Sequence, residues 1–213
     1  EHHSVLNACH ALEAKNIEVS YLPVDRNGRV SLEDVTNAIK SNTKFVSIML
    51  ANNEIGAIQP IAEIGQFLHD KGIMFHSDAV QAVGHIPVDV NDLHVDFLSA
   101  SAHKFNGAKG TGILYNRSGI CLPNMVFGGR QEQGHRAGTE NVAGIVAAGY
   151  ALTENIIEIG ETDKRLRVMI QTTVNEIRKK IPDVWINGSI GPHLPGMINL
   201  GFYGVSGEAL MNI

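Results

Sequence analysis

Phe45-Val46-Ser47-Ile48-Met49-Leu50 is a nearly continuous apolar run. A short run of this kind is typical of a parallel strand that is covered on both faces of its sheet. Pro60 suits the first position of a helix, which we expect to extend to about Asp70. Further apolar runs predict strands at residues 73–76, 95–98 and 112–115. Strands separated by helices predict an α/β domain with a largely parallel sheet.

The chain before this run predicts two helices and a strand. Apolar residues recur at helical spacing over residues 3–14, and Ile17 to Leu22 alternates in polarity as a strand does. Ser31 and Asp34 are spaced as in a capping box, which predicts a helix that begins there and ends near Ile39.

The second half of the chain has a different pattern. Residues 137–157 and 162–180 predict two long helices separated near Gly160, and residues 184–186 and 197–202 predict strands. We therefore expect a large domain over residues 1–158 and the beginning of an incomplete second domain over residues 159–213. The first residue is glutamate and the last residues begin a helix, so we expect an internal piece of a longer protein.

Composition limits the class of protein. Hydrophobic residues make up 44% of the 213 residues and charged residues 18%, as in a globular protein with a sizeable core. The net charge of -5 supplies no basic face for nucleic acid, and we expect no membrane-spanning run of about 20 apolar residues. Only Cys9 and Cys121 are present, which favours a reducing compartment, and we expect a cytoplasmic protein. Both cysteines lie among apolar neighbours, and we expect them to be buried packing residues.

Polar side chains follow three of the predicted strands, where open α/β sheets bind their ligands. Asn53 follows the run at 45–50, Asp78 and Gln81 follow residues 73–76, and Lys104 follows residues 95–98. Each has an ordinary interpretation: Asn53 as a turn residue, Asp78 as a helix cap, and Lys104 as a solvated surface residue.

Together these loops offer an acid, amides and a lysine beyond one edge of the sheet. A lysine can form a Schiff base with an aldehyde, and a carboxylate can pair with a protonated ring nitrogen. Asn53 and Gln81 can contact a ring oxygen, and the hydroxyls of Ser99 and Ser101 are suited to hold an anion beside Lys104. The combination fits pyridoxal phosphate as a cofactor.

Five segments extend this interpretation to the whole chain. They are Glu1-His2, Asn52-Asn53-Glu54-Ile55-Gly56, His76-Ser77-Asp78-Ala79-Val80-Gln81, Ser99-Ala100-Ser101-Ala102-His103-Lys104 and Arg136-Ala137-Gly138-Thr139-Glu140-Asn141. In their order and spacing they resemble the cysteine desulfurases, which are class V, fold-type I pyridoxal-phosphate enzymes that include the selenocysteine lyases. The resemblance implies that residues 1–158 form the large cofactor domain and that residues 159–213 begin the small α+β domain.

The resemblance also implies roles for individual residues. Lys104 would hold the cofactor as a Schiff base, and His2 would stack on its ring and help to move protons. Asp78 would pair with the ring nitrogen, and Asn53 and Gln81 would contact the phenolic oxygen. The phosphate would be bound by three further residues, Ser101, His103 and, from the other subunit of a homodimer, Thr139.

The implied reaction removes sulfur from L-cysteine and leaves L-alanine and an enzyme persulfide. The persulfide sulfur would pass to an iron–sulfur scaffold protein or another sulfur acceptor. The catalytic cysteine of the family lies beyond the position of Ile213, and neither Cys9 nor Cys121 is assigned its role, so we expect this chain alone to be inactive. No metal site is predicted, because His2, His3 and His10 lack the spacing and further donors that metal ligands need.

Two alternatives remain beside a cysteine desulfurase. One is a selenocysteine lyase or another class V enzyme such as an aminotransferase, although the segments at 52–56 and 136–140 disfavour an aminotransferase. The other is a folded, dimerising fragment without catalysis.

Overall fold

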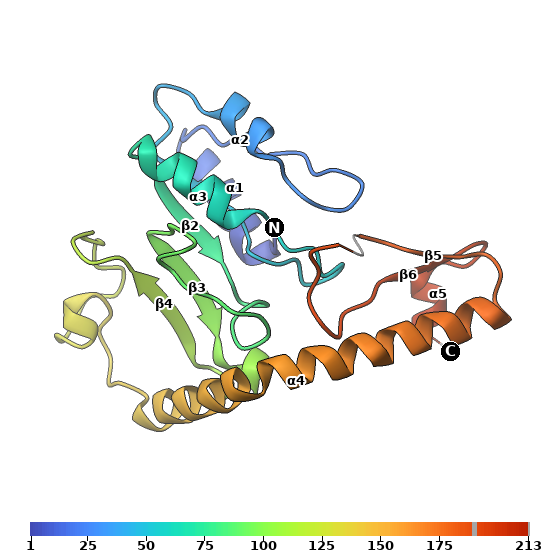
Figure 1. Ribbon diagram of the computed structural model, residues 1–213. Helices are drawn as coiled ribbons and strands as arrows, with labels where there is room; N and C mark the ends of the chain where they lie inside the picture. Colours follow the sequence, from blue (N-terminus) through green and yellow to red (C-terminus); the bar gives the residue numbers. More distant parts are fainter. Residues whose placement is uncertain (189–190, 213) are drawn as a thin grey trace.

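The centre of the computed structural model is a four-stranded sheet with the strand order β1-β2-β3-β4 (Figure 1). The structure describes residues 1–188 and 191–212. The strands are β1 (Phe45–Ser47), β2 (Met74–Asp78), β3 (Phe97–Ser101) and β4 (Gly112–Asn116). β1, β2 and β3 run parallel, and β4 is antiparallel to β3. The predicted α/β fold with a largely parallel sheet is confirmed.

Helix α3 (Ile61–Asp70) covers one face of this sheet (Figure 1). Ile64 and Leu68 of the helix and Phe75 of β2 are fully buried in the core between them. Pro60 is the N-cap of α3 and not its first helical residue. Gly65 has no side chain, so α3 lies directly against the backbone of Leu93 at this position. This contact brings α3 close to the connection before β3.

The predicted helices near the start of the chain are also present. α1 spans His3–Glu13 and α2 spans Leu32–Ala38, where the Ser31 side chain accepts a hydrogen bond from Asp34 N as an N-cap. Of the strands predicted in this part of the chain, one is absent and one is shorter than expected. Residues 17–22 form no strand, because no other described segment pairs with their backbone. The strand predicted over residues 45–50 is shorter, and it is not covered on both faces, since Phe45 is 50% exposed.

β3 continues beyond its predicted end at Leu98. Its antiparallel pairing with β4 extends from Phe97↔Asn116 to Ser101↔Gly112, so Ser99 and Ser101 belong to the strand. A short 3-10 helix, η1 (Ala102–Phe105), follows directly and contains Lys104. A second short 3-10 helix, η2 (Glu132–Gly134), lies in the long connection after β4.

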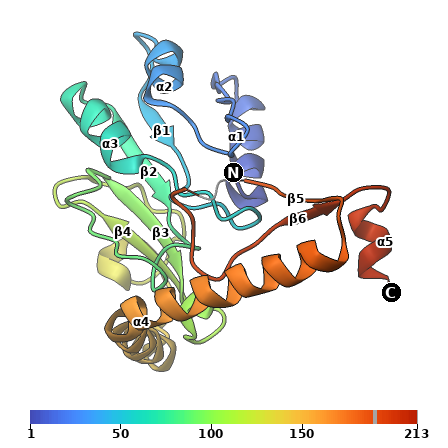
Figure 2. The ribbon, with the colours of Figure 1, turned by 45° about the vertical axis from the view of Figure 1, so that its right-hand side comes forward.

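The second half of the chain is dominated by one helix, α4 (Val142–Lys180), which is 39 residues long. The two helices predicted on either side of Gly160 are therefore continuous. A glycine in a helix interior costs only about 1 kcal/mol, which is too little by itself to end a helix. The predicted domain boundary near residue 158 falls inside this helix. The small sheet of β5 (Val184–Ile186) and β6 (Leu200–Phe202) and helix α5 (Gly207–Met211) lie beside the C-terminal half of α4 (Figure 2).

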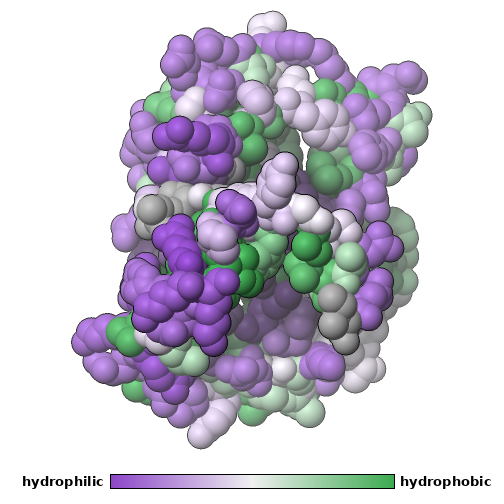
Figure 3. Space-filling view, turned by 90° about the vertical axis from the view of Figure 1, so that its right-hand side faces the viewer, coloured by the Kyte–Doolittle hydropathy of each residue, from purple (hydrophilic) through white to green (hydrophobic). Residues whose placement is uncertain are grey.

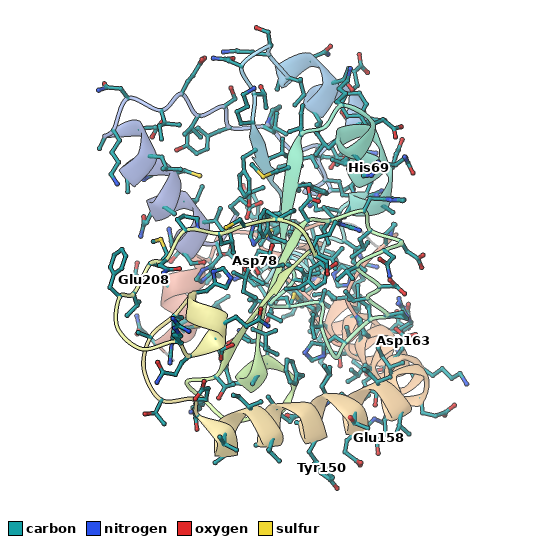
Figure 4. All side chains as sticks on the ribbon, turned by 90° about the vertical axis from the view of Figure 1, so that its left-hand side faces the viewer. His69, Asp78, Tyr150, Glu158, Asp163 and Glu208 are labelled. Atoms are coloured by element: carbon teal, nitrogen blue, oxygen red, sulfur yellow. The ribbon has the colours of Figure 1, made fainter. Side chains whose placement is uncertain are left out.

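The N-terminal half of α4 exposes many apolar side chains. Tyr150 is 70% exposed and points away from the rest of the molecule (Figure 4). By length and composition alone, α4 is the one helix within the described ranges that could cross a membrane, which corrects the expectation of no such run. We call a group of exposed apolar residues at the start of the helix and in the connection before it the apolar face of α4; they are Val142, Ile145, Val146 and Tyr150 of the helix and Met125 and Phe127 of the connection.

Candidate active site at the carboxyl edge of the sheet

The parallel strands β1, β2 and β3 bring three of the predicted loops to one edge of the sheet. Beyond β1, Leu50 N donates to Asp78 O at 2.8 Å. Beyond β2, Ala79 N donates to Ser99 O at 2.9 Å. The loops that carry Asn53, Asp78 and Lys104 therefore leave the sheet next to one another, where α/β sheets bind ligands.

Asp78 is the last residue of β2, and its side chain is only 8% exposed (Figure 4). Its Oδ1 accepts a hydrogen bond from Val80 N at 2.9 Å, which forms a local turn and not a helix cap. No salt bridge to Asp78 occurs in the described part of the chain. A buried carboxylate without a cationic partner is costly, so this position fits a ligand that carries a protonated ring nitrogen.

Lys104 lies in η1, one turn beyond the end of β3, and the backbone around it is held from three sides. His85 Nε2 lies 2.8 Å from Lys104 O, and Asn155 Nδ2 donates to Phe105 O at 2.9 Å. The Phe105 ring is fully buried against Ala148 of α4. The Lys104 amine makes no hydrogen bond or salt bridge to any residue that the structure describes. The structure thus combines a fixed backbone with an amine that is free to react with an aldehyde.

His85 and Asn155 are supports that the sequence did not reveal. His85 is 19 residues from Lys104, and Asn155 is 50 residues from Phe105. Neither residue belongs to a local motif with η1, so no spacing rule connects them. The only related signal was the predicted helix over residues 137–157, which could not be placed against η1 without the fold.

Ser101 and His103 lie on either side of the start of η1. Ser101 Oγ and His103 Nδ1 are 2.9 Å apart, and His103 is exposed. Both groups can donate hydrogen bonds to an anion next to Lys104. Ser99, the other candidate for anion binding, has a different partner: its Oγ lies 2.9 Å from His76 Nε2.

His2 reaches the same edge through its neighbour Glu1. Glu1 Oε1 accepts a hydrogen bond from Met49 N at 2.7 Å, just beyond β1. Burial raises the pKa of the Glu1 carboxyl, and the charge of Asp78 acts in the same direction. His2 is the N-cap of α1, where its Nδ1 accepts from Ser4 N at 3.1 Å. The start of α1 therefore places an exposed imidazole beside this edge.

The other predicted residues are placed less closely. Asn53 lies in the turn after β1, but Asn52 stabilises that turn, because its Oδ1 accepts from Glu54 N and Ile55 N, both at 2.9 Å. Gln81 is half-buried in the turn that follows Asp78. Thr139 is exposed in the segment before α4 and has no hydrogen bond to the sheet edge within the described residues. The cofactor roles of these three residues stay predictions.

The two cysteines differ from their predicted burial. Cys121 is exposed, because it lies on an irregular surface segment after β4. Cys9 is half-buried on α1, and burial raises the pKa of its thiol, with Glu1 and Glu13 acting in the same direction. A thiol with a raised pKa is a poor nucleophile near neutral pH.

A cavity of about 220 Å³ lies elsewhere. Its wall includes Arg167 and Gln171 of α4 together with His193 and Leu194, and none of the predicted site residues lines it. The side of the molecule that carries β5, β6 and α5 is hollowed and mixes hydrophilic with hydrophobic residues (Figure 3). We place the candidate site at the sheet edge because the reactive side chains are there.

This arrangement is an α/β fold of fold-type I, in which a lysine and a buried carboxylate at the sheet edge are suited to a pyridine cofactor. The chain belongs to the class V aminotransferase family, whose sequence model matches residues 1–213. Enzymes of this family depend on pyridoxal phosphate.

Individual relatives agree with this assignment. The chain is 46% identical over 213 residues to "Cysteine desulfurase IscS" of Clostridium botulinum, covering 99% of this chain and 54% of the relative. A solved structure of a NifS-like protein superposes with a TM-score of 0.95 at 37% identity, covering 100% of this chain and 58% of that one. A structure described as SspA in complex with cysteine has a TM-score of 0.70 at 41% identity, covering 72% and 45%. The chain spans about half the length of these relatives.

Proposed function

We propose that the protein containing this chain is a pyridoxal-phosphate-dependent cysteine desulfurase. The observation that carries the proposal is the pair of Lys104 and Asp78 at one sheet edge: among the described residues, the lysine amine has no partner and the buried carboxylate has no cation. The relatives support the substrate, because those at 43–48% identity are named cysteine desulfurases and a similar structure contains cysteine.

Different residues at the sheet edge match the different chemical groups of this cofactor. Lys104 would hold the aldehyde carbon, Asp78 the ring nitrogen, and Ser101 and His103 the phosphate. Asn53 and Gln81 would contact the phenolic oxygen. When bound, pyridoxal phosphate supplies an electron sink for the electrons released at the substrate's α carbon.

Asp78 and His2 would then have two different roles. Asp78 holds a negative charge against the ring, in surroundings that exclude water. His2, whose exposed ring caps α1 beside this edge, would carry protons to and from the substrate. The cysteine sulfur would leave as a persulfide on an enzyme thiol, and L-alanine would be the other product.

The acceptor and the compartment follow from the same proposal. A persulfide sulfur requires a second protein thiol or an iron–sulfur scaffold protein to receive it. We propose a cytoplasmic location, which is consistent with a chain that has only two cysteines, both free.

A substrate assay tests the reaction. We expect the full-length protein, loaded with pyridoxal phosphate, to release sulfide and equimolar alanine from L-cysteine in the presence of a reducing thiol. As a control, the same preparation is assayed for transfer of an amino group from an amino acid to a keto acid. Transfer of the amino group to the keto acid without sulfide release would contradict the proposal and favour an aminotransferase. Faster turnover of selenocysteine than of cysteine would favour a selenocysteine lyase.

We propose further that the protein is a homodimer, with a second copy covering the apolar face of α4. This face is formed by one long helix and by the loop at residues 125–127, where Phe127 is 84% exposed. Exposed apolar patches of this kind mark interaction surfaces. Thr139, which by resemblance serves the other subunit's phosphate, lies in the segment that connects these two parts of the face.

The dimer is tested by placing a charge on this face. We expect Val146→Asp to weaken self-association by at least about 30-fold, since burying a lone carboxylate at an interface costs about 2 kcal/mol or more. Val168→Asp is the matched control, because Val168 is 66% exposed on the C-terminal half of the same helix and Val146 is 65% exposed. Sedimentation velocity measures both. A monomeric wild-type protein that binds lipid vesicles through this face would contradict the proposal.

A further inference from the structure

Three side chains form a hydrogen-bonded row across the first three strands. Ser47 Oγ lies 2.8 Å from His76 Nδ1, and His76 Nε2 lies 2.9 Å from Ser99 Oγ. Both ring nitrogens of His76 are therefore engaged, one by a residue of β1 and the other by a residue of β3. His76 is two residues before Asp78 on β2, so the two side chains lie on the same face of the sheet.

Both hydrogen bonds of this row can form while His76 is uncharged. A neutral imidazole has one donor and one acceptor nitrogen, and each serine hydroxyl can serve as the matching partner. Burial lowers the pKa of His76 below its ordinary value of 6.5, while the charge of Asp78 opposes this shift. Phe45 stacks on the ring, with the two planes 14° apart. Of the charged groups in the described chain, Asp78 is the one that acts on His76.

The row also connects two parts of the candidate site. Ser99 is the register partner of Asp78, and the strand that contains Ser99 leads directly into η1 and Lys104. A bond from His76 to Ser99 therefore links the strand that ends at the carboxylate with the strand that leads to the lysine. A protonated His76 would instead be a cation beside Asp78 and would compete for the carboxylate.

We propose that His76 is a positioning residue for Asp78: as an uncharged ring bridging β1 and β3, it fixes the end of β2 and leaves the carboxylate to pair with the ring nitrogen of pyridoxal phosphate. This inference rests on the proposed function. In this inference His76 acts through Asp78 and is assigned no contact with the cofactor or the substrate.

Two substitutions separate the hydrogen bonds from the volume of the ring. His76→Phe keeps an aromatic ring but removes both hydrogen bonds, whereas His76→Gln keeps a neutral donor and a neutral acceptor. We expect His76→Phe to weaken pyridoxal phosphate binding by at least about tenfold, because displacing a positioned group even slightly is costly. We also expect its cofactor ring nitrogen to lose protonation, read from the resonance of ¹⁵N-labelled cofactor, and His76→Gln to restore both properties.

The uncharged state of His76 is measured separately in the wild-type protein without cofactor. Its ¹⁵N imidazole resonances are expected to show a neutral ring at pH 7 that titrates below 6.5. Should His76→Phe not fold, Ser99→Ala, which removes one of the two bonds, takes its place with the same readings. A charged ring at pH 7, or unchanged cofactor affinity and ring-nitrogen resonance in the variant, would overturn the inference alone. Failure of the wild-type protein to bind pyridoxal phosphate would overturn the proposed function, and the inference with it.

Discussion

Gly65→Ala is expected to lower the free energy of unfolding, although alanine is the better helix former. Gly65 lies inside α3, where alanine would gain about 1 kcal/mol in helix propensity. A Cβ at this position would lie closer than 3.0 Å to the backbone oxygen of Leu93, which cannot move aside as a side chain can. Overpacking of this kind costs about 3 kcal/mol, so the expected net loss is about 2 kcal/mol. Urea denaturation measures it.

Gly160→Ala is the matched control, because it makes the same chemical change inside a helix without the clash. Nothing lies within 4 Å of a Cβ at Gly160, which is in the interior of α4. We expect this variant to gain up to about 1 kcal/mol of stability. Opposite signs for the two variants would confirm that α3 is packed against the Leu93 backbone. A stabilised Gly65→Ala protein would show that it is not.

Lys104→Ala is expected to abolish the absorbance band that appears when pyridoxal phosphate binds covalently to the protein. The reason is that the Lys104 amine, which has no partner among the described residues and lies on a fixed backbone, is the group we propose to react with the aldehyde. Sulfide release by the full-length protein should fall at least about 100-fold, because the group that would hold the cofactor covalently is lost. Absorbance titration and the sulfide assay measure the two effects.

Lys109→Ala is the control for the lysine assignment. Lys109 is exposed in the loop between η1 and β4, and like Lys104 it forms no salt bridge in the described chain. We expect the variant to retain both the band and the activity. A band that survives in Lys104→Ala and disappears in Lys109→Ala would reverse the assignment.

The parts of the fold that were predicted from sequence depend on local patterns. The apolar runs around Val46, Phe75 and Leu98 identified the sheet, because side chains buried in a parallel sheet leave a continuous apolar signal. The strand predicted over residues 17–22 failed, since alternation alone cannot supply a neighbouring strand. The helix break predicted at Gly160 failed because a single glycine in a helix interior costs only about 1 kcal/mol, which does not end a helix by itself.

The residues of the candidate site were likewise predicted only where a local pattern pointed to them. Asp78 and Lys104 were predicted because each follows a recognisable strand and because their chemistry is complementary. His85, Asn155 and His76 were not assigned, since their importance depends on contacts between distant segments. The exposure of Cys121 was also missed, because apolar neighbours in sequence do not reveal an irregular surface segment.

The unbroken length of α4 has a mechanical consequence. At 1.5 Å per residue, its 39 residues form a rod about 58 Å long. Asn155, in the first half of α4, donates a hydrogen bond to the Phe105 carbonyl next to Lys104. The β5–β6 sheet lies beside the far end of the helix (Figure 2). If the helix is rigid, a tilt of its far end must either shift the backbone next to Lys104 or bend the helix. Gly160 is the one glycine between Asn155 and the far end of α4, so it is where we expect such bending to be concentrated.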